Sequence, residues 1–276
     1  CPFARLSCTS LMIIGPDKIL RCPSCHALMR GRTFRSYSTW GARFWSDGYV
    51  QDGVSSPDWT LCPGCKQGLY VRDLEEVGRG PDEYRLHHAR MNRMFALRNV
   101  RAALKDRSWL TRLRRRFGKL PSLDELKAYE AELEVEEDDT DPNAYPGSED
   151  LPSIAEMPPS DYERLLAEGL HGGDTEKEIS LRQEYWWTMN DPLRKDPALR
   201  AEPLEAHHRN LRRLEELLLK DGSPDVSIVA LRMELGRFEE AREYLATLPV
   251  SERSQKQRDA FTAAIEQRVD RVFRIK

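Results

Sequence analysis

The sequence "RCPSCHALMRG" at residues 21–31 returns in altered form as "TLCPGCKQGLY" at residues 60–70. Each stretch holds two cysteines separated by two residues, and 36 residues separate the two pairs. A C-x-x-C turn brings two thiolates together, and a second pair from a distant part of the chain completes a tetrahedron of soft ligands. The spacing therefore predicts a metal-pinned ribbon that binds structural Zn²⁺ through Cys22, Cys25, Cys62 and Cys65.

Four cysteine ligands leave no coordination position open for a water molecule, so a catalytic zinc is not expected. Iron in place of zinc, a redox pair and four free core cysteines are the alternatives. Gly64 and Gly68 are expected to permit the close approach of backbone amides to the thiolates. Because paired C-x-x-C motifs in a long helical chain indicate metal ligation in a reducing compartment, we expect a cytoplasmic protein.

The length of 276 residues predicts two units, and 32% charged residues with a mean hydropathy of -0.66 predict a helix-rich globular protein. No run reaches the roughly 18 apolar residues of a membrane span, so no membrane association is expected. The opening "CPFARLSCTSL" holds no apolar core of signal-peptide length. We expect natural translation to start at Met12; a lipid-modified Cys1 is the rival interpretation.

Residues 12–78 are predicted to form the zinc-ribbon module. Between the cysteine pairs, aromatic, Thr and Val residues punctuated by Gly and Asp-Gly favour short strands and tight hairpins. An inserted hairpin is expected to carry Trp40, Phe44 and Trp45. These aromatic side chains are expected to cover the thin core of the metal-pinned sheet. The alternative is that they stack on bases, but residues 22–77 hold six basic and six acidic side chains and offer no electrostatic footprint for phosphate.

The net charge of -3 conceals two opposite blocks. Residues 79–119 hold 13 basic and 3 acidic side chains, whereas residues 124–163 hold 15 acidic side chains and one lysine. We predict a basic helix and a connecting helix within residues 79–134, the second opening with a capping box at Ser122 and Glu125. Residues 135–157 are predicted to be a mobile acidic linker that buries no core.

The basic helix at residues 90–119 is the candidate nucleic-acid-binding element, because clustered Lys and Arg attract phosphate. The acidic block that follows is expected to fold back and mask this surface, or the charged face is simply solvated. The candidate phosphate-binding residues are Arg98, Arg101, Arg112, Arg114, Arg115 and Arg116.

Residues 158–276 are predicted to be a helical domain that ends in a long helix over 252–274. "LGRFEEAREYLATLP" at residues 235–249 resembles the second half of a tetratricopeptide repeat, with Gly236 at the turn and Ala241 where the helices approach. The first half departs from the pattern, and only one such unit is visible. Trp186 and Trp187 face different directions on a helix; one is expected in the core and the other as an anchor for a partner.

Several stretches together, including "GARFWSDGYVQDG", "YWWTMNDPLR" and "ALRMELGRFEEA", resemble uncharacterised bacterial proteins that join a zinc ribbon to a tetratricopeptide-like helical region. This resemblance implies the architecture and no site residues beyond the cysteines. No GxSxG, P-loop or dinucleotide-binding fingerprint is present.

The sequence therefore predicts an α+β chain, with a small β zinc ribbon followed by a mostly α-helical, tetratricopeptide-like region. The predicted function is a non-catalytic zinc-binding adaptor that engages a protein partner through its ribbon and helical surfaces. Nucleic-acid binding through the basic helix is the alternative, and an enzyme with its site between the units is a weaker one.

Overall fold

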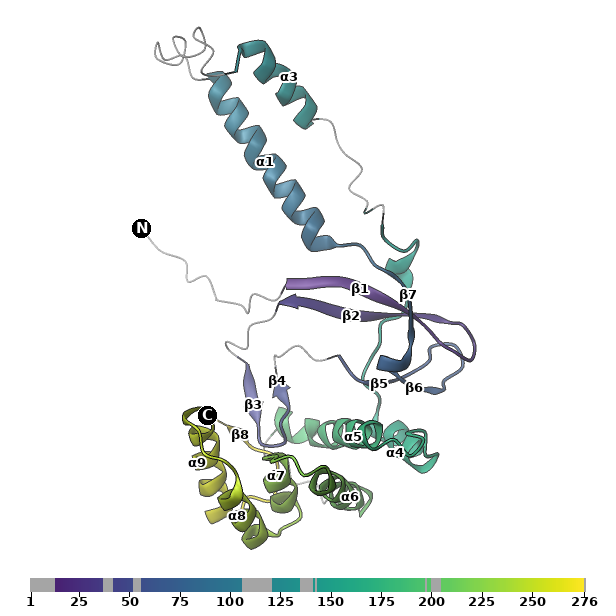
Figure 1. The fold of residues 1–276 in the computed structure, drawn as a ribbon, viewed down its shortest axis with the longest axis vertical. Helices are drawn as coiled ribbons and strands as arrows, with labels where there is room; N and C mark the ends of the chain where they lie inside the picture. Colours follow the sequence, from purple (N-terminus) through teal and green to yellow (C-terminus); the bar gives the residue numbers. More distant parts are fainter. Residues whose placement is uncertain are drawn as a thin grey trace.

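The computed structural model describes residues 13–36, 42–51, 56–105, 121–134, 141, 143–196, 198–199 and 205–275. Small antiparallel sheets form the N-terminal part, and helices form most of the remainder (Figure 1). The predicted α+β class is therefore confirmed. Across these described ranges, no helix combines the length and apolar character needed to cross a membrane.

Two sets of antiparallel strands carry the cysteine turns, and we refer to them together as the ribbon. One is a three-stranded sheet in the order β2-β1-β7, built from β1 (Ile13–Arg21), β2 (Leu28–Ser36) and β7 (Glu75–Arg79). The other is the hairpin of β5 (Trp59–Leu61) and β6 (Gly68–Tyr70). One C-x-x-C turn connects β1 to β2 and the other connects β5 to β6, so both cysteine turns lie at the ends of paired strands.

The predicted inserted hairpin is present as β3 (Arg43–Trp45) and β4 (Val50–Gln51), and it belongs to a different sheet from the one expected. Its third strand is β8 (Arg274–Ile275), near the C-terminus. The turn of the hairpin contacts the helical region, since the Ser46 amide donates to the Phe273 carbonyl at 2.9 Å. Trp45 is therefore buried away from the ribbon core that it was expected to cover, while Trp40 lies outside the described residues.

Helices α1 (Glu83–Lys105) and α3 (Leu123–Glu134) project from the three-stranded sheet as an arm (Figure 1). The predicted capping box is confirmed: the Ser122 amide donates to Glu125 Oε2 at 2.7 Å, and the Glu125 amide donates to Ser122 Oγ at 3.2 Å. Arg101 of α1 pairs with Glu130 of α3 at 2.9 Å. Part of the acidic block thus folds back on the basic helix, as expected.

Residues 143–157, the described part of the predicted linker apart from residue 141, lie against the ribbon. The Arg30 amide donates to the Pro152 carbonyl and the Ile154 amide donates to the Arg30 carbonyl, both at 2.8 Å. Met157 is buried in a core cluster with Trp59. The expectation that this segment buries no core is therefore wrong for Met157, because the edge of β2 supplies the backbone partners that the segment cannot supply to itself.

The C-terminal helices follow the predicted order, with one difference at the end. The last helix stops at Glu266 instead of continuing to residue 274. Arg268 then adopts a left-handed conformation with φ 51, and the chain turns back so that Phe273 packs against Phe261 before β8 joins β3. The helices are α4 (Pro159–Ala167), α5 (Thr175–Lys195), α6 (Glu205–Asp221), α7 (Ser227–Glu234), α8 (Phe238–Thr247) and α9 (Glu252–Glu266).

The ribbon and the helices share buried side chains. Trp59 of β5 packs in one cluster with residues of α4 and α5, among them Leu165 and Tyr185. A second cluster lies among α5 to α9 and includes Trp186, Ala241 and Phe261. The hairpin β5-β6 therefore carries one of the two cysteine turns and packs against the first two C-terminal helices.

Candidate metal centre

The two C-x-x-C turns have the same backbone structure. In the first turn, the Cys22 amide donates to the carbonyl two residues beyond Cys25 at 2.9 Å, and the His26 amide donates to the Cys22 carbonyl at 3.0 Å. Cys62 and Lys66 make the equivalent bonds in the second turn, at the same two distances. His26 and Lys66 have φ angles of 60° and 61°, so the chain reverses identically after each second cysteine.

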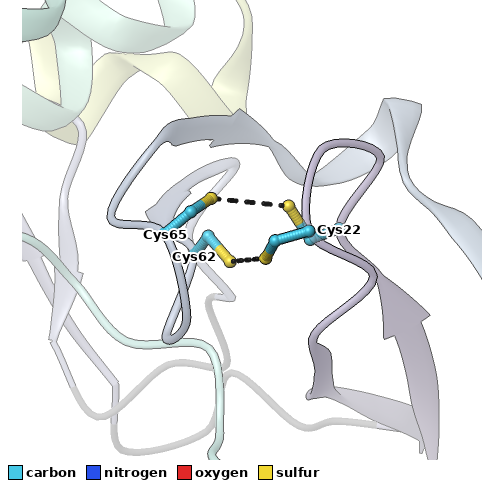
Figure 2. A group of neighbouring side chains, drawn as sticks. Cys22, Cys62 and Cys65 are labelled. Carbon is cyan, nitrogen blue, oxygen red and sulfur yellow. Dashed lines mark hydrogen bonds between the residues drawn. The ribbon is translucent and has the colours of Figure 1, made fainter.

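The paired turns bring all four cysteine sulfurs within 4.8 Å of one another (Figure 2). The Sγ atoms of Cys25 and Cys62 are 3.4 Å apart, and those of Cys22 and Cys65 are 3.9 Å apart. A regular tetrahedron with Zn–S bonds of about 2.3 Å has sulfur–sulfur separations of about 3.8 Å. A disulfide would need about 2.05 Å. The predicted cysteines are therefore brought together in an arrangement that fits one tetrahedral metal ion.

Gly64 allows the two turns to approach each other. A Cβ atom at this position would lie 3.1 Å from Ala27 Cβ and 3.2 Å from Cys25 Sγ. Gly68 has a different role from the one predicted, because a Cβ there would lie 2.5 Å from Leu165 Cδ2. The close approach at Gly68 is made by helix α4 and not by the thiolates.

The cluster has one buried side and one exposed side. Cys22 and Cys62 have no exposed surface, whereas Cys25 and Cys65 are exposed. Leu20, Met29 and Leu69 pack against the two buried cysteines. This apolar floor restricts water on one side of the cluster, and the exposed Cys25 and Cys65 leave the other side open to solvent.

The protonation of Cys65 reflects the crowding of the thiols. A hydrogen bond from the Gln67 amide lowers the pKa of the Cys65 thiol. Desolvation and the neighbouring thiols together raise this pKa by more, so that it is about 11. The Cys65 thiol therefore loses its proton less readily in the absence of a cation. A bound metal ion supplies that positive charge, and binding it would release the thiol protons.

The structure separates the candidate partner-binding tryptophans. Trp186 has no exposed surface, and its indole N–H donates to Glu234 Oε2 at 2.9 Å. Trp186 is therefore the tryptophan of the pair that lies in the core, and it has no exposed surface that a partner could contact. Trp187 stacks edge-on against Tyr49 of the β3-β4 hairpin, with ring centroids 5.8 Å apart. In this structure Trp187 therefore anchors a contact within its own chain.

The candidate phosphate-binding arginines are only partly described. Arg98 and Arg101 lie on α1 and both line a shallow groove along this helix. Arg101 is also paired with Glu130. Residues 112–116, which hold the other four arginines, lie outside the described residues.

A buried polar junction joins the β3-β4 hairpin to helix α5, and sequence reasoning missed it. Asp47 accepts hydrogen bonds from Asn190 Nδ2 at 3.0 Å and from Arg194. The Arg194 guanidinium also lies 4.1 Å from the centre of the Tyr49 ring. Burial raises the pKa of Asp47, and the Arg194 charge opposes that shift. The signal in the sequence was the pair of polar stretches "WSDGY" and "MNDPLR", which no local pattern relates to each other.

Comparison of the chain with protein-family models, with curated proteins and with solved structures finds no match.

Proposed function

We propose that this protein is a non-catalytic adaptor in which a structural Zn²⁺ ion holds the ribbon in shape for contact with a protein partner. The observation that carries this proposal is the closed set of four cysteine sulfurs within 4.8 Å. Four thiolates favour zinc over harder cations and leave no position for a substrate or an activated water. The tetratricopeptide-like character of the helices is part of the same proposal, supported by the turn at Gly236, with φ 73, and the buried Ala241.

The arm of α1 and α3 offers a surface for the protein partner. Met94 and Phe95 expose 56% and 54% of their area on α1, although large apolar side chains are usually buried. The groove beside Met94 is lined by Leu97 and Ala102 together with basic side chains. An apolar surface bordered by charge is typical of contacts between proteins.

Metal analysis tests the zinc centre. Protein purified without chelators or a nickel column should contain about one zinc ion per chain by plasma mass spectrometry. Cys62→Ser should lose the metal and unfold the ribbon, whereas Cys8→Ser removes a cysteine outside the two pairs and should retain it. Absence of metal, or iron accompanied by colour, would overturn the zinc centre.

Photo-crosslinking tests the adaptor role. A photoreactive amino acid at position 95 should capture a protein in cells, and the capture should persist in high salt because apolar contacts are not screened. Met94→Ser should reduce the yield, and Val250→Ser, at a similarly exposed apolar position, should not.

Nucleic-acid binding through α1 remains the second candidate, supported by Arg98 and Arg101 at one groove. Capture of nucleic acid in place of protein, lost steeply as salt rises, would favour this candidate over the adaptor.

A further inference from the structure

A small cavity lies where the hairpin β3-β4, the approach to β5 and helices α4 and α5 meet. Its volume is about 30 Å³, which is room for a group the size of one or two water molecules. Three aromatic side chains line it, namely Tyr49, Tyr162 and Trp187. Among the described residues that line it, the acidic ones are Glu156, Glu184 and Asp191, and none is basic.

Glu184 is the buried acid of this cavity, with 8% of its area exposed. Its carboxylate accepts hydrogen bonds from the Asp58 amide and, at 3.2 Å, from the Tyr162 hydroxyl. In the part of the chain that the structure describes, no Lys, Arg or His forms an ion pair with Glu184 or Glu156. Burying an ionised carboxylate without a nearby cation is costly, so a positively charged group in the cavity would stabilise ionised Glu184.

The neighbours of Glu184 reinforce this preference. The titratable groups facing it from the packed elements are Asp58, Tyr162, Glu156, Asp191 and Tyr49, all of which are acidic or phenolic. Two arginines lie beside these groups and are already engaged. Arg72 pairs with Asp58. Arg194 pairs with Asp191 at 2.6 Å and lies 4.1 Å from the centre of the Tyr49 ring, so the acids that lack a cation are Glu184 and Glu156. Burial accordingly raises the pKa of Glu184 to about 8, more than its hydrogen bonds lower it.

We propose that this cavity is a binding site for a primary ammonium group, held by Glu184 and Glu156 and enclosed by Tyr162 and Trp187. Aromatic faces attract cations through their quadrupoles, and this attraction strengthens when water is excluded. The size of the cavity admits –NH₃⁺ and excludes a quaternary ammonium. The same chemistry is offered by a lysine side chain of a polypeptide and by a free amine. The site stands apart from the metal centre and does not depend on the proposed adaptor role.

Two-dimensional NMR of the full-length protein tests the site. n-Butylammonium should shift the signals of the Asp58 amide, the Thr188 amide and the Trp187 indole in a saturable manner. n-Butanol, which is neutral, and tetramethylammonium, which is too large, should not. Equal shifts with n-butanol, or no saturable shift with n-butylammonium, would overturn the proposal.

The pH dependence and a pair of variants identify the acid. If only ionised Glu184 binds the cation, affinity rises roughly thirtyfold between pH 6.5 and 9, a range in which the amine stays protonated. Glu184→Gln should abolish this rise and weaken binding at pH 9 at least about tenfold. Glu176→Gln removes the same charge from an exposed site on α5. This variant should change neither the pH dependence of the affinity nor the affinity at pH 9. Thermal melting of both variants verifies folding, and unchanged binding by folded Glu184→Gln would refute the assignment.

Two further ligands, each compared with n-butylammonium, distinguish the sources of the ammonium group. Tighter binding of Nα-acetyl-lysine-N-methylamide than of n-butylammonium would identify a polypeptide lysine. Tighter binding of 1,4-diaminobutane would identify a free diamine. Both outcomes support an ammonium site.

Discussion

Arg194 and Asp47 form an ion pair between residues 147 positions apart, with only 3% and 0% of their side chains exposed. The pair fastens the β3-β4 hairpin, which belongs to the N-terminal part of the chain, to the last turn of α5. Around it, the Trp187 indole donates to the Asp47 carbonyl at 2.9 Å, and Asn190 bridges Asp47 to Glu234. The contact between the N-terminal and C-terminal parts is therefore polar at this point, and Asp47, Asn190 and Arg194 are buried in it.

We predict that Asp47→Ala destabilises the protein by about 3 kcal/mol, because it removes the buried carboxylate and leaves the buried Arg194 charge with the partly exposed Asp191 as its remaining ion-pair partner. Urea denaturation measures the loss. The exposed pair of Arg242 and Glu239 is the matched control, and Glu239→Ala should change the free energy of unfolding by less than about 0.5 kcal/mol. A similar small change for Asp47→Ala would show that the buried pair is not formed in solution.

The pH dependence of stability should report Glu184. Its pKa is about 8 in the folded protein and 4.5 as a free side chain. Between these values the folded state holds a proton that the unfolded state has released, so the contribution of Glu184 to stability falls as pH rises. The slope is at most about 1.4 kcal/mol per pH unit.

Glu184→Gln removes this contribution. The difference between the variant and the parent protein in urea-derived free energy should grow from pH 5 to pH 8 and then level off, while Glu176→Gln should follow the parent curve. Parallel curves for Glu184→Gln and the parent would mean that Glu184 titrates normally.

Gly64→Ala should weaken the metal centre without changing its ligands. The new Cβ would crowd Cys25 Sγ and the neighbouring Ala27, and relieving contacts of 3.1–3.2 Å moves a ligand from its place. Overpacking costs typically about 1–3 kcal/mol, which corresponds to a loss of affinity of about fivefold to one-hundred-and-fiftyfold. Competition with a chromogenic chelator measures it. Gly80→Ala, where a Cβ makes contacts no closer than 3.6 Å, is the control.

Gly68→Ala tests the packing of the ribbon on helix α4. The added methyl would meet Leu165, which is fully buried, at 2.5 Å. We expect a loss of about 1–3 kcal/mol in the free energy of unfolding. Leu165→Ala creates space at the same position, so the double variant should lose less than the sum of the single ones. Strict additivity in this double-mutant cycle would contradict the contact between β6 and α4.

The cysteine cluster could be predicted from the sequence because each C-x-x-C turn is formed by residues that are close together in the chain. Each pair needs only its own turn, and the repeated motif predicted that the two turns would meet. The capping box at Ser122 and Glu125 was predictable for the same reason, since both bonds lie within four residues. The helical hairpin of α7 and α8 also follows from local signals, with Gly236 at its turn.

The sequence by itself thus determined the elements whose signals are local: the cysteine turns, the capped helices and the mixed class of the fold. Only the tertiary structure decided where "WSDGY" packs, where the last helix ends and which acid is buried without a cation. These features depend on contacts such as Asp47 with Arg194 and Phe273 with Phe261. Their partners are distant or their burial depends on several elements at once, so no spacing along the chain encodes them.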